Sequence, residues 1–175
     1  MKRAVEKWQH WEFWPPSVFY LPVAVYYLWM ALRYGGLRLP TQANPGIFSG
    51  GIVGESKWET LRALQECSPD FTATTWPIQS RNAPERLAEL RTLCSNHGLS
   101  YPFILKPDVG QRGVGVKLIR SEEQAAAVLT QTDGLILLQR YAPGPGEVGV
   151  FYYRFPDESR GRIFAITEKV FPNWR

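Results

Sequence analysis

The chain has 175 residues, 45% of them hydrophobic, and a formal net charge of +4. This length and composition indicate a globular protein of one domain or two small ones. The basic residues are dispersed and no nucleic-acid-binding motif is present, so we expect no nucleic-acid partner. Cys67 and Cys94 have no paired spacing, which suits reduced thiols in a cytoplasmic protein. A zinc site would need these two cysteines, His10 and His97 to converge from distant positions, and we expect none.

The segment from Phe13 to Leu32 carries no charged residue and is rich in Trp and Tyr. Pro15 and Pro16 cannot lie inside a helix cheaply, so an unbroken helix would run from about Pro22 to Arg33. Such a helix would be roughly 18 Å long, against about 30 Å of membrane hydrocarbon. We favour a buried helix. Contact with a membrane surface through residues 13–33 and a true membrane span stay open as alternatives.

A glycine-rich loop, Asn44 to Gly54, precedes a helix that is predicted from about Ser56 to Glu66. Ser56 and Glu59 have capping-box spacing, which marks the start of this helix. A loop that leads into a helix N-terminus can hold a carboxylate or a phosphate. A turn shaped by packing alone explains the same residues, so both interpretations stay open.

Residues 67–81 are rich in Pro, Thr and Ser, which predicts a boundary between an N-terminal domain, residues 1–75, and a second domain, residues 76–175. The next segment, residues 82–98, has proline near its start and glycine at its end, as helix termini prefer. Leucines and a cysteine recur on one face of this predicted helix, so we expect it to pack on the core.

The most informative segment is the stretch from Lys106 to Gly115. Phe103 to Leu105 are predicted to form a buried strand that ends at Lys106, and Val114 to Ile119 alternate as a second strand. A Walker loop or a dinucleotide fingerprint would need a helix after the glycines, so this context excludes both. Glycine lets backbone amides approach a phosphate, and Lys106 and Arg112 would add positive charge. We expect a polyphosphate ligand here, with an ordinary hairpin as the alternative.

Capping-box spacing from Ser121 to Gln124 predicts a helix after this hairpin. Three further strands are predicted, at residues 134–138, 147–155 and 162–170. The order from Tyr101 is therefore strand, strand, helix, strand, strand, strand.

This order, with the sequences PFILKPDVGQRGVGV and LLQRYAPGPGE, resembles the first nucleotide-binding subdomain of the ATP-grasp superfamily over residues 99–169. Members of that superfamily hold ATP between two α+β subdomains and join a carboxylate to an amine or thiol through an acylphosphate. The segments NPGIFSGGIVGESK and GVFYYRFP are similar to a bacterial branch labelled as carboxylate-amine ligases or D-alanine:D-alanine ligase-like proteins. The resemblance implies an α/β chain in which a small N-terminal α/β domain precedes an α+β nucleotide-binding subdomain.

The resemblance also implies individual roles. Lys106 matches the lysine that reaches the ATP phosphates, Glu147 the acid that binds the ribose hydroxyls, and Lys169, more loosely, a later phosphate-contacting lysine. Gln139 stands where the family usually has glutamate and begins the segment that binds adenine through its backbone. The implied cofactor-binding residues are Lys106, Gly110, Gln111, Arg112, Gly113, Val114, Gly115, Gln139, Arg140, Tyr141, Ala142, Glu147 and Lys169. The implied acceptor-substrate residues are Gly50, Gly51, Gly54, Ser56 and Lys57.

The superfamily takes its magnesium ligands and its acylphosphate-binding arginine from a second subdomain, which we expect beyond Arg175. We therefore interpret the chain as the ATP-binding half of a ligase, inactive alone, with ATP and Mg²⁺ as cofactors of the whole enzyme. A non-catalytic nucleotide- or anion-binding module is the alternative, with membrane contact through residues 13–33. The carboxylate, the amine and the oligomeric state are not indicated by the sequence.

Overall fold

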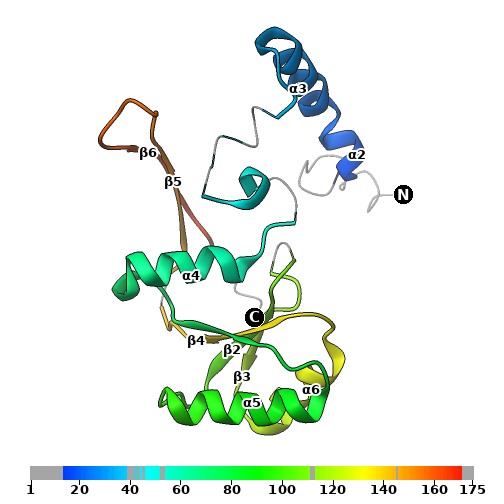
Figure 1. The fold of residues 1–175 in the computed structure, drawn as a ribbon, viewed down its shortest axis with the longest axis vertical. Helices are drawn as coiled ribbons and strands as arrows, with labels where there is room; N and C mark the ends of the chain where they lie inside the picture. The colour runs from blue at the N-terminus through cyan, green and yellow to red at the C-terminus, as the bar shows by residue number, and fades with distance from the viewer. Residues whose placement is uncertain are drawn as a thin grey trace.

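The computed structural model describes residues 14–170, except residues 39–41, 43, 45, 52–53, 111–112 and 145. They form a mixed α and β protein with a four-stranded and a two-stranded sheet (Figure 1). The helices are α2 (Pro16–Phe19), α3 (Leu21–Tyr34), α4 (Lys57–Cys67), α5 (Ala83–Asn96) and α6 (Glu122–Gln131), with short 3-10 turns η3 (Phe48–Gly51) and η4 (Pro69–Phe71). The strands are β1 (Thr75–Ile78), β2 (Phe103–Pro107), β3 (Lys117–Ile119), β4 (Ile136–Arg140), β5 (Val148–Tyr153) and β6 (Arg162–Glu168). All strand pairs among the described residues are antiparallel.

The four-stranded sheet has the order β1-β4-β2-β3 and carries the hydrophobic core. α5 and α6 cover one face of this sheet, and α4 lies on the other (Figure 1). Four residues on the α5 and α6 side are at most 1% exposed: Phe103, Leu105, Ile136 and Leu138. Because side chains alternate between the faces of a sheet, Lys106 and Gln139 lie on the side of α4. The apolar core therefore fixes which face carries the polar candidates.

Three predicted helix starts are confirmed. Ser56, Asn82 and Ser121 each precede the first helical residue, and each side chain accepts a hydrogen bond from the backbone N–H three residues later. These bonds satisfy N–H groups that the first turn of a helix leaves unpaired. Local capping chemistry therefore sets where α4, α5 and α6 begin.

The glycine-rich hairpin after β2 is confirmed, but its second strand is shorter than predicted. The alternating pattern predicted a strand from Val114, whereas β3 begins at Lys117. Gly113 and Gly115 have φ angles of 74° and 79°, in the left-handed region that strands do not use. The turn therefore extends through both glycines.

The predicted boundary segment, residues 67–81, contains a strand. β1 pairs antiparallel with β4 at one edge of the sheet. It includes Pro77, which lacks an N–H but is tolerated in an edge strand. Two of the residues that suggested a boundary, Thr75 and Pro77, therefore belong to the sheet itself.

The N-terminal part differs from the expectation in two ways. α3 forms as predicted but buries none of its residues, so the preferred interpretation of a core helix is wrong. The described residues of the expected small α/β domain, residues 1–75, form helices, and only the last of them, Thr75, belongs to a strand. Among the described residues, no helix is both long enough and apolar enough to cross a membrane.

β5 and β6 form a hairpin of their own that extends away from the four-stranded sheet (Figure 1). Every residue of the two strands is exposed except Tyr153, which is half-buried. The hairpin therefore contributes little to the core.

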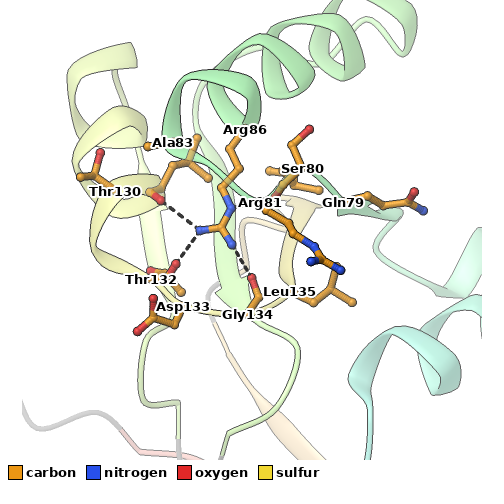
Figure 2. Close-up of a pocket in the computed structure, with 12 residues that line it drawn as sticks. Gln79, Ser80, Arg81, Ala83, Arg86, Thr130, Thr132, Asp133, Gly134 and Leu135 are labelled. Atoms are coloured by element: carbon orange, nitrogen blue, oxygen red, sulfur yellow. Dashed lines mark hydrogen bonds between the residues drawn. The ribbon is translucent and has the colours of Figure 1, made fainter.

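The buried guanidinium of Arg86 joins α5 to the end of α6 and to the turn before β4 (Figure 2). Its three nitrogens donate to four backbone carbonyl oxygens, at 2.5 to 3.2 Å: those of Ser80, Leu129, Thr132 and Gly134. Two of these carbonyls lie at the C-terminal end of α6, where a cation is also favoured by the helix dipole. Arg86 is therefore a structural clamp.

We expect Arg86→Met to lower the free energy of unfolding by about 3 kcal/mol, because buried carbonyls would lose their donors while the apolar volume is kept. Urea unfolding followed by circular dichroism measures this change. Arg91→Met, on the exposed side of the same helix, removes an ion pair with Glu122 and should leave the midpoint almost unchanged. Equal effects of the two substitutions would contradict the clamp.

Candidate functional site

Lys106 lies near the end of β2, on the face of the sheet that α4 covers. Its Nζ donates a hydrogen bond to Oε1 of Gln139, at 3.0 Å. Nε2 of Gln139 in turn donates to Oγ1 of Thr75, at 2.9 Å, and to the carbonyl oxygen of Ala73, at 3.1 Å. These side chains form a polar row across β2, β4 and β1, with Lys106 at one end.

The polar row explains why an amide suits position 139. Because a lysine only donates, the oxygen of Gln139 must face Lys106, and its nitrogen then faces the carbonyl of Ala73. A glutamate at this position would turn a carboxylate oxygen toward that carbonyl, and the two acceptors would repel each other. The departure of Gln139 from the glutamate of the ATP-grasp pattern is thus matched by its surroundings.

Asp108 fastens the N-terminus of α4 to the segment that follows β2. It is 8% exposed, and its Oδ1 accepts hydrogen bonds from the N–H of Trp58, at 2.7 Å, and from Oγ of Ser56, at 3.1 Å. The N–H of Asp108 donates to the carbonyl of Leu135, at 3.0 Å. Unpaired N–H groups and the helix dipole both favour a carboxylate at this end of a helix. The chain itself therefore supplies the anion that was expected at the start of α4.

The start of α4 and the segment after β2 thus meet at what we call the junction. Lys57 brings a second ammonium group to this junction. Its Nζ donates to the carbonyl oxygens of Asp108, at 2.8 Å, and Gly110, at 2.9 Å. Lys57 and Ser56 come from the predicted substrate-binding segment, and Gly110 from the predicted phosphate-binding loop, so hydrogen bonds join the two. Three other residues were predicted to bind the substrate: Gly50, Gly51 and Gly54. Among the described residues, no hydrogen bond joins them to this junction.

The charges of Lys57 and Asp108 both affect the pKa of Lys106. Its pKa is lowered from the ordinary lysine value, mainly because the ammonium group is partly removed from water. The positive charge of Lys57 lowers this pKa further, while the negative charge of Asp108 raises it. The two lysines therefore repel each other beside the start of the glycine-rich loop, and an anion between them would relieve that repulsion.

The glycine-rich loop depends on glycine for its path. A Cβ on Gly115 would lie 2.9 Å from both Cγ and Cδ of Pro107, closer than carbon atoms pack, and its φ of 79° is unfavourable for other residues. Val114, beside it, is 74% exposed. Two predicted phosphate-binding residues lie outside the described residues: Gln111 and Arg112.

The segment predicted to bind adenine lies at the end of β4. Gln139 and Arg140 belong to the strand, and the N–H of Arg140 donates to the carbonyl of Thr74, at 2.9 Å. Tyr141 and Ala142 follow the strand and are exposed. The backbone of these last two residues is therefore the part of the segment that lies beyond the sheet.

Glu147 and Lys169 bind each other at the open end of the β5 and β6 hairpin. Nζ of Lys169 lies 3.0 Å from both carboxylate oxygens of Glu147. The backbone N–H of Lys169 also donates to the backbone carbonyl of Glu147, at 2.8 Å. Both side chains are more than half exposed. This pairing gives each residue a structural role in the hairpin besides the nucleotide contacts that the resemblance implies.

No three His, Cys, Asp or Glu side chains in the described part of the chain lie together so that they could hold a metal ion. Asp108, at the junction, uses Oδ1 to accept from Ser56 and Trp58. Mg²⁺ is therefore an expectation from the resemblance alone.

A cavity of about 490 Å³ lies between the start of α5 and the end of α6, and Figure 2 shows its lining. None of its lining residues is a predicted site residue. Its buried cation, Arg86, already donates to backbone carbonyls. The ammonium groups of Lys57 and Lys106, in contrast, make two hydrogen bonds and one hydrogen bond within the chain, respectively, which leaves each of them N–H donors for a ligand. The junction of these lysines is therefore the better candidate site.

Comparison with known proteins does not identify the chain: no protein-family model matches it, and neither does any curated protein. The resemblance to the ATP-grasp superfamily thus depends on the sequence motifs and on the order of the elements. Function must be argued from the geometry of the junction.

Sequence reasoning missed Asp108, although it connects the two candidate segments. Its partner Trp58 lies 50 residues earlier in the chain, and local spacing rules do not reach so far. One signal is present in the sequence: Asp108 is an acid two residues after Lys106, where a buried strand ends. An acid at such a position can cap a helix that packs against the end of the strand.

We expect Lys57→Met to raise the pKa of Lys106, because the substitution removes a positive charge that disfavours the protonated form. The pH dependence of Lys106 acetylation by trace acetic anhydride, followed by peptide mass spectrometry, measures this pKa. Lys117→Met changes an exposed lysine of β3 and is the matched control. An identical pKa of Lys106 in Lys57→Met and in the unaltered chain would show that the charge of Lys57 does not act on Lys106.

Proposed function

We propose that this chain binds ATP as the nucleotide-binding half of an ATP-grasp ligase that joins a carboxylate to an amine through an acylphosphate. The observation that carries the proposal is that Lys57, whose ammonium group donates to the carbonyl oxygen of Gly110 at the start of the glycine-rich loop, lies near enough to Lys106 for its charge to lower the pKa of that lysine. The sequence resemblance supplies the type of reaction, and the geometry supports the type of ligand.

The junction suits a polyphosphate better than a single small anion. Lys106 and Lys57 approach from different elements, β2 and α4, and each retains N–H donors beyond the hydrogen bonds that it makes within the chain. A ligand with several negative charges can accept from both ammonium groups at once. The exposed loop with its glycines can add backbone N–H groups to the same phosphates.

The nucleotide base would lie on the far side of Lys106, along the polar row toward the end of β4. Gln139 holds Lys106 through its side chain, and two residues further on the backbone of Tyr141 and Ala142 leaves the sheet. Backbone groups there would form hydrogen bonds with adenine, as the resemblance implies. Lys106 thus positions the phosphates and the end of β4 the base.

In the reaction, the residues of this chain would orient the triphosphate so that the γ-phosphoryl group faces the carboxylate substrate. Positioning and electrostatic stabilisation of the developing charge are the main contributions that a protein makes to phosphoryl transfer. Lys106 and Lys57 would hold the phosphates, and the glycine-rich loop would exclude water from them.

We expect ATP to bind more tightly than GTP to the whole protein, and Lys106→Ala to weaken ATP binding by about tenfold or more through loss of a charged hydrogen bond. Isothermal titration calorimetry measures both affinities. Lys117→Ala, which removes an exposed lysine on the neighbouring strand, should leave the affinity unchanged. Equal ATP affinity of the Lys106→Ala variant and the parent protein would remove Lys106 from the site and contradict the proposal.

A further inference from the structure

α3 presents a continuous apolar face to solvent. Four aliphatic residues lie on this face at spacings of four, three and four, and they are 55% to 86% exposed: Leu21, Val25, Leu28 and Leu32. Residues at these spacings stack along one side of a helix. On the other side, Tyr27, Met30 and Ala31 are only partly exposed, and the hydroxyl of Tyr27 donates to the carbonyl of Leu37. The segment after α3 therefore contacts the helix at Tyr27, away from the aliphatic face, and leaves that face open.

Exposed aromatic residues also lie on and next to α3, mostly on sides of the helix other than the aliphatic face. Tyr20, Tyr26, Trp29 and Tyr34 are each between 54% and 61% exposed. Tyrosine and tryptophan combine an apolar ring with a polar tip, and they are enriched where a protein meets the interface between lipid and water. Their exposure on the same helix thus points to that kind of environment.

The charges around α3 all have one sign. Between Glu12 and Glu55 the sequence contains no acidic residue, and its only charged residues are Arg33 and Arg38. Both follow the apolar stretch, at and just beyond the C-terminal end of α3. This arrangement complements a negatively charged surface.

The aliphatic face of α3 could belong to a membrane span, pack on a second helix or lie on a membrane surface. The length and composition of α3 decide between these three arrangements. α3 has 14 residues, about 21 Å of helix, which is shorter than the roughly 30 Å hydrocarbon core. Helices that pair along such a face carry several charged residues beside it that set the register, whereas Arg33 is the only charged residue of α3. A helix of this kind suits the surface of a bilayer, with its axis in the plane of the membrane.

We propose that α3 binds the surface of an anionic lipid bilayer, with its aliphatic face in the acyl region and Arg33 and Arg38 among the lipid headgroups. The nucleotide-binding junction would then work next to a membrane. This inference uses no residue of the junction, so it stands or falls independently of the ATP-binding proposal.

The test is co-sedimentation of the 175-residue chain with extruded vesicles, after aggregates are removed by centrifugation. Vesicles of phosphatidylcholine and phosphatidylglycerol at a three-to-one ratio should bind the chain more tightly than phosphatidylcholine alone. Replacing both arginines, Arg33→Gln and Arg38→Gln, should reduce binding to the anionic vesicles by roughly fivefold for each charge.

The apolar contact is tested by the double substitution Leu28→Gln and Leu32→Gln, which keeps residues that favour a helix. It should weaken binding by about tenfold or more, because two exposed leucines no longer enter the lipid. The matched control is Val150→Gln with Ile166→Gln, a pair of exposed residues that face each other in the β5 and β6 hairpin. This control should bind vesicles like the unaltered chain.

Three results would overturn the proposal: no binding to anionic vesicles, equal loss of binding in the leucine variant and the hairpin control, or full binding by the leucine variant. Light scattering without lipid provides a further check. A stable dimer that the leucine variant converts to a monomer would show that a second copy, rather than a membrane, covers this face.

Discussion

The arrangement of the candidate site depends on the hydrogen bonds that the carboxylate of Asp108 accepts at the N-terminus of α4. This carboxylate joins two segments that are 50 residues apart in the chain. One segment carries Lys57 and the other continues from Lys106 into the glycine-rich loop. Without this carboxylate, the helix N-terminus would lose its capping anion, and the hydrogen bonds of Lys57 to backbone carbonyls would be left to hold α4 to the segment after β2. A helix N-terminus that could have held an external anion is thus used internally, and the lysines beside it become the groups available to a ligand.

The four-stranded sheet determines which side chains face this junction. Its apolar face is packed against α5 and α6, so alternate residues of β2 and β4 must turn toward α4. Lys106 is therefore held half-buried, where the loss of water and the charge of Lys57 lower its pKa. The amide of Gln139 holds the ammonium group without neutralising it. A charged carboxylate at that position would have formed an ion pair with Lys106 and would have reduced its attraction for phosphate.

Local features of the structure were predictable from the sequence, and long-range ones were not. Ser56 and Ser121 mark helix starts because a cap depends on residues three positions apart. The hairpin after Lys106 follows from alternation and from glycine. β1 was missed because Pro77 is typical of boundaries, although an edge strand tolerates it. The burial of α3 was predicted wrongly because an apolar sequence shows that a helix avoids water but not what covers it.

The central claim is that Lys57 and Lys106 share one polyphosphate ligand. The most direct measurement is an NMR titration of the chain, with its six lysines labelled by ¹³C reductive methylation, against tripolyphosphate. We predict that the Lys57 and Lys106 signals shift together with one dissociation constant, while the Lys117 signal stays in place. Uniform shifts of all lysine signals, or shifts that leave Lys57 and Lys106 unaffected, would contradict the account.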